Sequence, residues 1–212
     1  MIQRRRFLGA AAGGLLAACS ALPDKPVRAT LYDFGPETSS EPPANAVNAA
    51  NPLPLVLGDI ESTSALEGTA VLYRLGYANG NELRPYAQAR WSAPPPQLVR
   101  QRLRRQLGRD RPVLDLTENA ALARTGAKVR ILRMGLEEFS QLFDSPAQSA
   151  GLLRLRVTLL EESAAGERLL AQRSFTLRRP APSADAAGGV QALAAATDAA
   201  ADEIAQWLRT VP

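Results

Sequence analysis

The stretch LRPYAQARWSAPPPQLVRQRLRRQL, residues 83–107, contains the change of periodicity that decides the fold. Up to Trp91 the residues alternate as in a strand, with Tyr86 and Arg90 on one face and Trp91 on the other. Prolines occupy positions 94–96, and proline is tolerated in the first turn of a helix. Beyond them the apolar residues recur at helical spacing, at Val99, Leu103 and Leu107. A strand therefore leads directly into an amphipathic helix that ends at Gly108.

Further segments of the same two kinds lie on both sides of this stretch. Asn79-Gly80, between two alternating segments, is typical of a hairpin turn. The expected strands are residues 53–60, 71–77, 83–91, 128–133, 153–159 and 169–177, and the expected helices are 97–107 and 190–211. The order β-β-β-α-β-β-β-α predicts an α+β fold, an antiparallel or mixed β-sheet with two amphipathic helices packed on one face.

The composition excludes most catalytic chemistry and most metal sites. The 212 residues include no histidine and one cysteine, which excludes histidine-based triads, histidine-ligated metals and cysteine-rich zinc sites. Adjacent acids such as Glu137-Glu138 point to opposite sides of a strand, and neither lysine follows a serine at a hydrolase spacing. We therefore predict no enzyme activity, no catalytic residue and no metal site.

The charge is concentrated at the beginning of the chain. The sequence has 25 basic and 21 acidic residues, and Arg4, Arg5 and Arg6 all precede Asp24, its first acidic residue. Without these three arginines the two signs nearly balance. Nucleic-acid binding requires a clustered excess of positive charge. No nucleic-acid partner is therefore expected.

The first twenty residues, MIQRRRFLGAAAGGLLAACS, have the features of a bacterial lipoprotein signal. Leu16-Ala17-Ala18-Cys19 resembles the lipobox, in which the cysteine receives a diacylglycerol and, after cleavage, an N-acyl chain. We expect a signal at 1–18, lipidated Cys19 with a flexible tether at 19–52, and the folded domain at 53–212. These acyl chains would be the only non-protein group. Export by the Sec route and by the twin-arginine route both fit residues 4–8. Ser20, which is not aspartate, favours the periplasmic face of the outer membrane.

Three segments together resemble the ABC-type transport auxiliary lipoproteins, which include the paraquat-inducible C-type lipoproteins. They are Cys19 followed by a Tyr32 segment, the strand ending in Arg90-Trp91, and the helix ending in EIAQWL at 203–208. The resemblance implies a periplasmic accessory subunit of a lipid transporter that docks and scaffolds. Its partners would be mammalian-cell-entry (MCE) domain proteins and inner-membrane ABC transporter subunits, and a homo-oligomer is compatible with it. The Pro- and Asn-rich residues 35–52 depart from the family pattern, so residues 30–34 fit a first strand or part of the tether.

Two groups of side chains are candidates for binding. Tyr86, Arg90 and Trp91 fit an exposed docking surface, since tyrosine, arginine and tryptophan are frequent interface anchors. The alternative places Trp91 in the core and leaves Arg90 as a solvated charge. Arg100 and Arg104 fit contact with an anionic lipid surface or an acidic partner, or an ordinary solvated helix face. The alternative function is a structural lipoprotein that assists assembly of an outer-membrane barrel or secretion pore.

Overall fold

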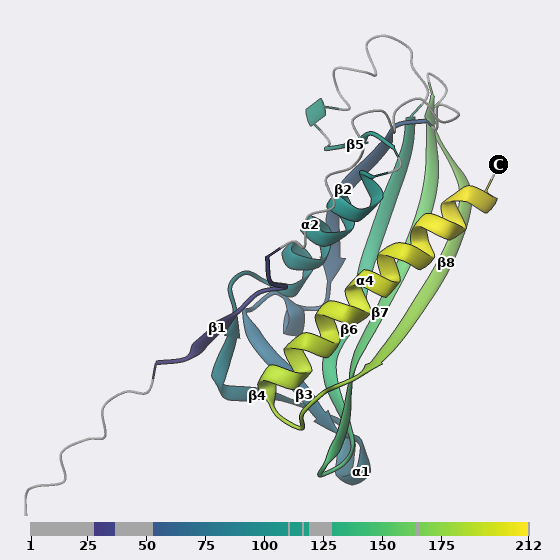
Figure 1. The fold of residues 1–212 in the computed structure, drawn as a ribbon. Helices are drawn as coiled ribbons and strands as arrows, with labels where there is room; N and C mark the ends of the chain where they lie inside the picture. The colour runs from purple at the N-terminus through teal and green to yellow at the C-terminus, as the bar shows by residue number, and fades with distance from the viewer. Residues whose placement is uncertain are drawn as a thin grey trace, which may run out of the picture.

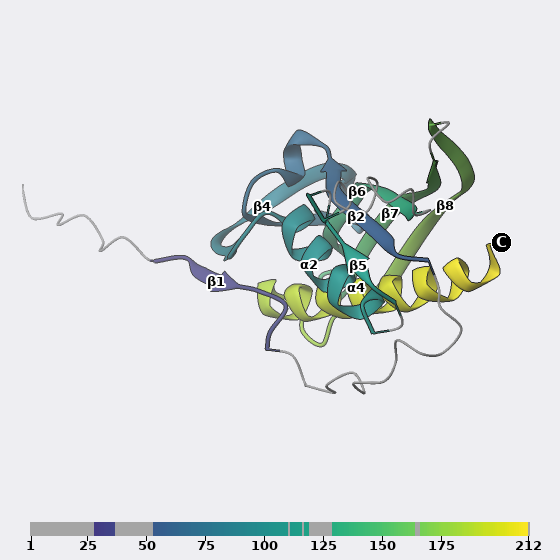
Figure 2. The same cartoon turned by 90° about the horizontal axis from the view of Figure 1, so that it is seen from above.

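The computed structural model describes residues 28–36, 53–109, 111–115, 117–118, 129–163 and 166–211. They form a mixed eight-stranded β-sheet with two long helices on one face (Figure 1). The view from above shows both helices on the same side of the sheet (Figure 2). This confirms the predicted α+β class, and the sheet is mixed rather than antiparallel. The predicted signal at 1–18, Cys19 and residues 37–52 lie outside the described ranges.

Strand β6 (Val129–Ser145) holds the two halves of the sheet together. It pairs in parallel with β2 (Leu55–Ser62) along its first half and with β3 (Ala70–Leu75) along its second. On its other side it pairs in antiparallel with β7 (Gln148–Ser163), and β8 (Gly166–Pro180) follows as the next strand. This single long strand thus pairs directly with β2, β3 and β7, and the remaining strands connect to it through these three.

The prediction of a short strand at 128–133 was wrong, because β6 has 17 residues. The apolar alternation at Leu132, Met134 and Leu136 resumes at Phe139 rather than at residue 138, because the pairing with β7 shifts between Leu136 and Glu138. A bulge of this kind moves all later side chains to the other phase of the alternation. The pattern beyond the bulge therefore does not continue the one before it. Strands β7 and β8 are also longer than predicted.

The predicted hairpin is present, with a longer connection than a two-residue turn. Strand β3 pairs in antiparallel with β4 (Gly80–Trp91), and one helical turn, α1 (Gly76–Asn79), joins them. The expected strand at 71–77 therefore ends at Leu75. The short η2 (Ser64–Leu66) precedes this hairpin. The two-residue β5 (Val113–Leu114) pairs with β2.

Strand β1 (Thr30–Tyr32) belongs to the sheet, so residues 30–32 form a first strand, one of the two interpretations that the sequence left open. It pairs in parallel with the end of β4, with Tyr32 opposite Trp91. The Ser92 amide donates to the Tyr32 carbonyl oxygen at 2.7 Å. Phe34 then places its ring edge-on to Trp91, with centroids 5.7 Å apart. These residues are held by hydrogen bonds and an aromatic contact and are not part of a tether.

Helix α2 (Pro95–Leu107) forms as predicted. Pro94 is its N-cap, and the Gly108 amide donates to the Arg104 carbonyl oxygen where the helix ends. Val99, Leu103 and Leu107 are buried against the sheet. The three-proline start and the glycine end therefore fix both limits of this helix.

Helix α4 (Ala186–Thr210) begins four residues before the predicted start at 190. The cap explains the difference, because the Asp185 carboxylate accepts a hydrogen bond from the Gly188 amide at 2.8 Å. An aspartate in this position satisfies an amide that has no partner inside the helix. Val211 follows the helix and is half-buried. The other residues of the predicted apolar face are buried: Val190, Leu193, Thr197, Ala200, Ile204 and Leu208.

Two glycines let α4 lie directly on the sheet. A β-carbon on Gly151 of β7 would lie 2.6 Å from the backbone of Ala192 and of Leu193. One on Gly189 of α4 would overlap the Gln141 side chain of β6. Backbone therefore contacts backbone, and the helix closes the inner face of the sheet.

We predict that Gly151→Ala lowers the free energy of unfolding by about 1–3 kcal/mol, because the added methyl group must push α4 away from β7. The matched control is Gly58→Ala, since a β-carbon there meets no atom within 4 Å. The control should change stability by less than about 0.5 kcal/mol. Urea denaturation followed by circular dichroism measures both. Equal stabilities for the two variants would contradict the close approach of α4.

Candidate functional site: the β4–α2 corner and the groove beside it

The structure places Trp91 in the core, which is the alternative interpretation of this residue. Its side chain is 1% exposed and lies 5.6 Å from the Phe139 ring, centroid to centroid. The alternation along β4 directs it inward, into the same apolar cluster as α2. Trp91 therefore presents no surface to a partner in this structure, and we do not retain a docking role for it.

Tyr86 is half-buried and begins a chain of polar contacts. Its hydroxyl donates to Gln141 Oε1 at 2.8 Å, and Gln141 Nε2 donates to Ser149 Oγ at 2.7 Å. The Tyr73 ring lies against it, with centroids 4.6 Å apart. Gln141 is fully buried. Because buried amides need hydrogen-bond partners, Tyr86 and Ser149 satisfy Gln141 beneath the start of α4.

Burial raises the pKa of the Tyr86 phenol to about 12, with smaller contributions from Tyr73 and Asp185. Loss of the proton would place a negative charge in a partly desolvated position. The neutral phenol, which donates to Gln141, is therefore the form that the fold favours.

Arg90 lies beside Tyr86, so the structure brings these two predicted residues together. Its Nη1 donates to the carbonyl oxygen of Tyr86 at 2.6 Å and to that of Ala89 at 2.8 Å. The side chain is half-buried and folded back along its own strand. Arg90 stabilises the end of β4 and leaves only part of its guanidinium group for a partner.

Arg100 and Arg104 have partners within the chain. Arg100 Nε donates to the Gly58 carbonyl oxygen at 3.0 Å and lies 3.7 Å from the Asp59 carboxylate. Arg104 lies 3.3 Å from Glu118 and 3.9 Å from Asp115. An anionic surface would have to compete with these acids.

No local pattern in the sequence indicates the contact that joins the two helices. Arg102 donates from Nε and Nη2 to the two oxygens of Asp198, at 2.5 and 2.8 Å. Gln106 Nε2 donates to the same carboxylate at 2.8 Å. Bidentate arginine–carboxylate pairs fix geometry as well as charge. Since 96 residues separate the partners, local spacing cannot reveal them.

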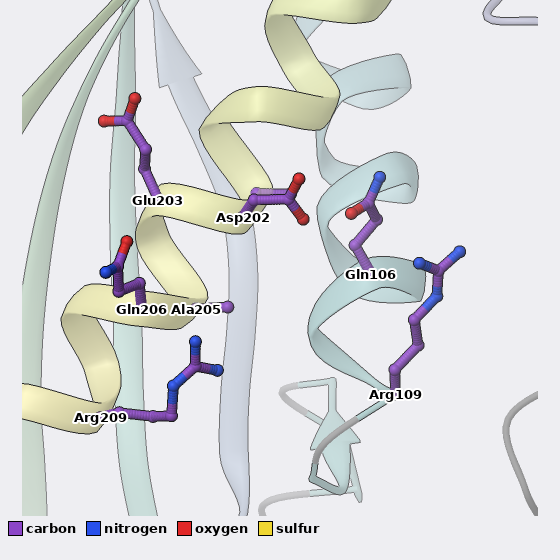
Figure 3. Close-up of a pocket in the computed structure, with 8 residues that line it drawn as sticks. Gln106, Arg109, Asp202, Glu203, Ala205, Gln206 and Arg209 are labelled. Carbon is purple, nitrogen blue, oxygen red and sulfur yellow. The ribbon is translucent and has the colours of Figure 1, made fainter.

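A groove of about 420 Å³ lies beside this contact, between α2 and α4 (Figure 3). In the close-up, Asp202 points toward α2 and the Arg209 guanidinium group points into the groove. Both signs of charge and amide groups are present, on walls formed by Gln106, Arg109, Ala201, Asp202, Glu203, Ala205, Gln206 and Arg209. This is a mixed polar surface.

The described residues contain no group of three or more cysteines, histidines or acids placed to hold a metal ion. Among the helices formed by the same residues, none is both long and apolar enough to cross a membrane.

Comparison with known proteins gives one family and several similar folds. The family described as "ABC-type transport auxiliary lipoprotein component" matches residues 32–205. No curated protein matches the chain. A crystal structure of a Xanthomonas campestris protein has a TM-score of 0.60 at 20% identity, covering 72% of this chain and 81% of its own. The structure of an uncharacterized protein has a TM-score of 0.55 at 15% identity, covering 85% and 99%. At these identities the two structures show a similar fold only.

We predict that Tyr86→Phe destabilises the protein by about 1–3 kcal/mol near pH 8, because Gln141 Oε1 loses its donor in a buried position. The difference in the free energy of unfolding between the unchanged protein and the Tyr86→Phe variant should shrink as the pH rises from 10 to 12. The unfolded tyrosine ionises near 10 and the folded one near 12, so stability from the raised pKa is complete below 10 and lost above 12. Urea unfolding of both proteins across this range measures the difference. A difference that stays constant up to pH 12 would contradict the raised pKa.

Proposed function

The chain belongs to the family of ABC-type transport auxiliary lipoprotein components, and from this premise we propose that it serves an envelope lipid transporter as a docking and scaffolding subunit. The family match carries the proposal, since it covers most of the sheet, all of α2 and most of α4. Membership makes the chain an auxiliary component of ABC-type transport, located in the cell envelope by a lipid anchor. The lipid cargo, the MCE-domain partner and the outer membrane are the further parts of the proposal.

The anchor would be Cys19, and the structure bears on its reach. Because β1 begins at Thr30, ten residues, 20–29, separate the acylated cysteine from the sheet. Even fully extended, the eleven steps from the Cys19 Cα to the Thr30 Cα span at most about 40 Å. A tether through residue 52 would reach about three times as far. The proposed anchor therefore holds the folded domain close to its membrane, with the β1–β4 edge as the point of attachment.

A docking role agrees with how the polar side chains are used. The hydroxyl of Tyr86, the guanidinium group of Arg102 and the carboxylate of Asp198 all bond to other groups of the chain. Polar groups that bond within the chain in this way hold the strands and helices of the fold in place. Tethering to a membrane raises the effective concentration of the domain near a membrane complex. A modest docking affinity is then sufficient for assembly.

The test is a crosslinked pull-down of the native protein from solubilised envelopes, read by mass spectrometry. The proposal expects an MCE-domain protein together with an ABC ATPase or permease. Recovery of an outer-membrane barrel or secretin without these components would contradict it. The assembly function would then replace transport.

Replacement of the anchor gives a second prediction. Cys19→Ala should remove the acylation site and leave the folded domain intact, because Cys19 precedes the first strand by ten residues. We expect the variant protein in the soluble periplasmic fraction, with an unchanged circular dichroism spectrum. Cys19→Ser is a matched variant that should behave in the same way. If both variants still fractionate with membranes, acylation of Cys19 is not the main anchor.

A further inference from the structure

The two faces of the sheet are unequal. Helices α2 and α4 lie on one face, and neither of these long helices lies on the other (Figure 2). On that open face the pairing register places Val56, Ile131, Leu160 and Leu169 in one row across β2, β6, β7 and β8. The first three are buried, whereas Leu169 is 60% exposed. The row therefore ends in an uncovered leucine at β8.

A hollow of about 640 Å³ lies beside this row on the open face. It forms where β2 and β6 are both irregular. The pairing shifts between Leu57 and Ile60 on β2, and between Leu136 and Glu138 on β6. Bulges turn the backbone and redirect side chains, and they are frequent beside functional sites. Two bulges on neighbouring strands therefore shape this part of the sheet.

Glycines keep the floor of the hollow open. A β-carbon on Gly58 of β2 or on Gly135 of β6 would meet no atom within 4 Å. Gly135 lies between Glu61 of β2 and Arg156 of β7 in the pairing. Any side chain at these two positions would project into the space. The hollow thus depends on the two glycines as well as on the two bulges in the backbone.

Carboxylates predominate on the rim. Two of these carboxylates are neutralised by ion pairs. Arg133 lies 2.7 Å from Glu167, and Arg156 lies 2.6 Å from Glu137. Arg100, from α2, lies 3.7 Å from Asp59, whose side chain is 93% exposed. Among the described residues of the rim, and with Arg100 included, acids outnumber arginines; the carboxylates are those of Asp59, Glu61, Glu137, Glu162 and Glu167.

We propose that this hollow binds an extended, basic segment of a partner protein. A lysine or arginine of that segment would enter over Gly58 and Gly135 and pair with the rim carboxylates, while an apolar neighbour would cover Leu169. An anionic lipid headgroup would meet the same acids with the wrong charge, so charge complementarity selects the cationic partner. The assignment rests on the proposed docking function and adds to it a surface and a partner chemistry.

The experiment measures binding of two fluorescent eight-residue peptides to the purified folded domain by anisotropy. One alternates lysine with leucine and valine, and the other carries glutamate in place of lysine. We expect the lysine peptide to bind at least tenfold more tightly, with an affinity that falls as salt rises. Equal affinities for the two peptides would overturn the proposal.

Three variants locate the binding. Gly135→Val fills the hollow with a side chain that suits a strand, and should weaken lysine-peptide binding at least tenfold with an unchanged unfolding midpoint. Glu61→Lys should have a similar effect, and it changes an exposed residue, so it remains informative if Gly135→Val fails to fold. Thr176→Val, on β8 outside the hollow, is the control and should bind as the unchanged protein does. Binding that neither Gly135→Val nor Glu61→Lys weakens would contradict the proposed site.

The pull-down separates this proposal from the proposed function. Recovery of ABC-transport components by the unchanged protein, with reduced recovery by Glu61→Lys, would support both. Full recovery by Glu61→Lys would overturn the hollow as the docking surface and leave the transport function standing. Concentration-dependent dimerisation that Glu61→Lys abolishes would assign the hollow to a second copy of this chain and overturn the basic-partner proposal.

Discussion

The contact between the backbone of α4 and the backbone of β7 at Gly151 determines how the rest of the molecule is arranged. No residue larger than glycine fits there without displacing the helix. Once α4 is seated, its Asp198 is in place to receive Arg102 and Gln106 from α2. The buried apolar faces of both helices then cover the inner side of the sheet, where Trp91, Phe139 and Phe175 lie. A single close approach thus sets the position of both helices and of the core.

Closing one face in this way leaves the other face of the sheet without either long helix, and the chemistry of the two sides differs. The inner side is apolar, and its buried polar groups, such as Gln141, are bonded within the chain. The outer side carries ion pairs such as Arg133–Glu167, together with a glycine-floored hollow. Strand β1 fixes where the proposed membrane tether joins this structure. The arrangement suits a subunit that is held at a membrane and recognises a partner through a surface.

The local patterns in the sequence were sufficient for the fold class and for both helices. The step from strand to helix between Trp91 and Pro95 was readable because prolines and a periodicity change coincide there. The length of β6 was not readable, because the bulge between Leu136 and Glu138 changes the phase of the alternation. The pair Arg102–Asp198 and the contact Tyr86–Gln141 join segments 96 and 55 residues apart. Such partners depend on tertiary packing, which no local spacing specifies.

The most direct test of the account is site-specific photocrosslinking in living cells. A photoreactive residue replaces either Arg154, exposed on the open face of β7, or Gln101, exposed on α2. The account predicts that position 154 crosslinks to a component of an ABC-type transport complex and that position 101 does not. Crosslinking of such a component from position 101 alone would contradict docking through the open face of the sheet.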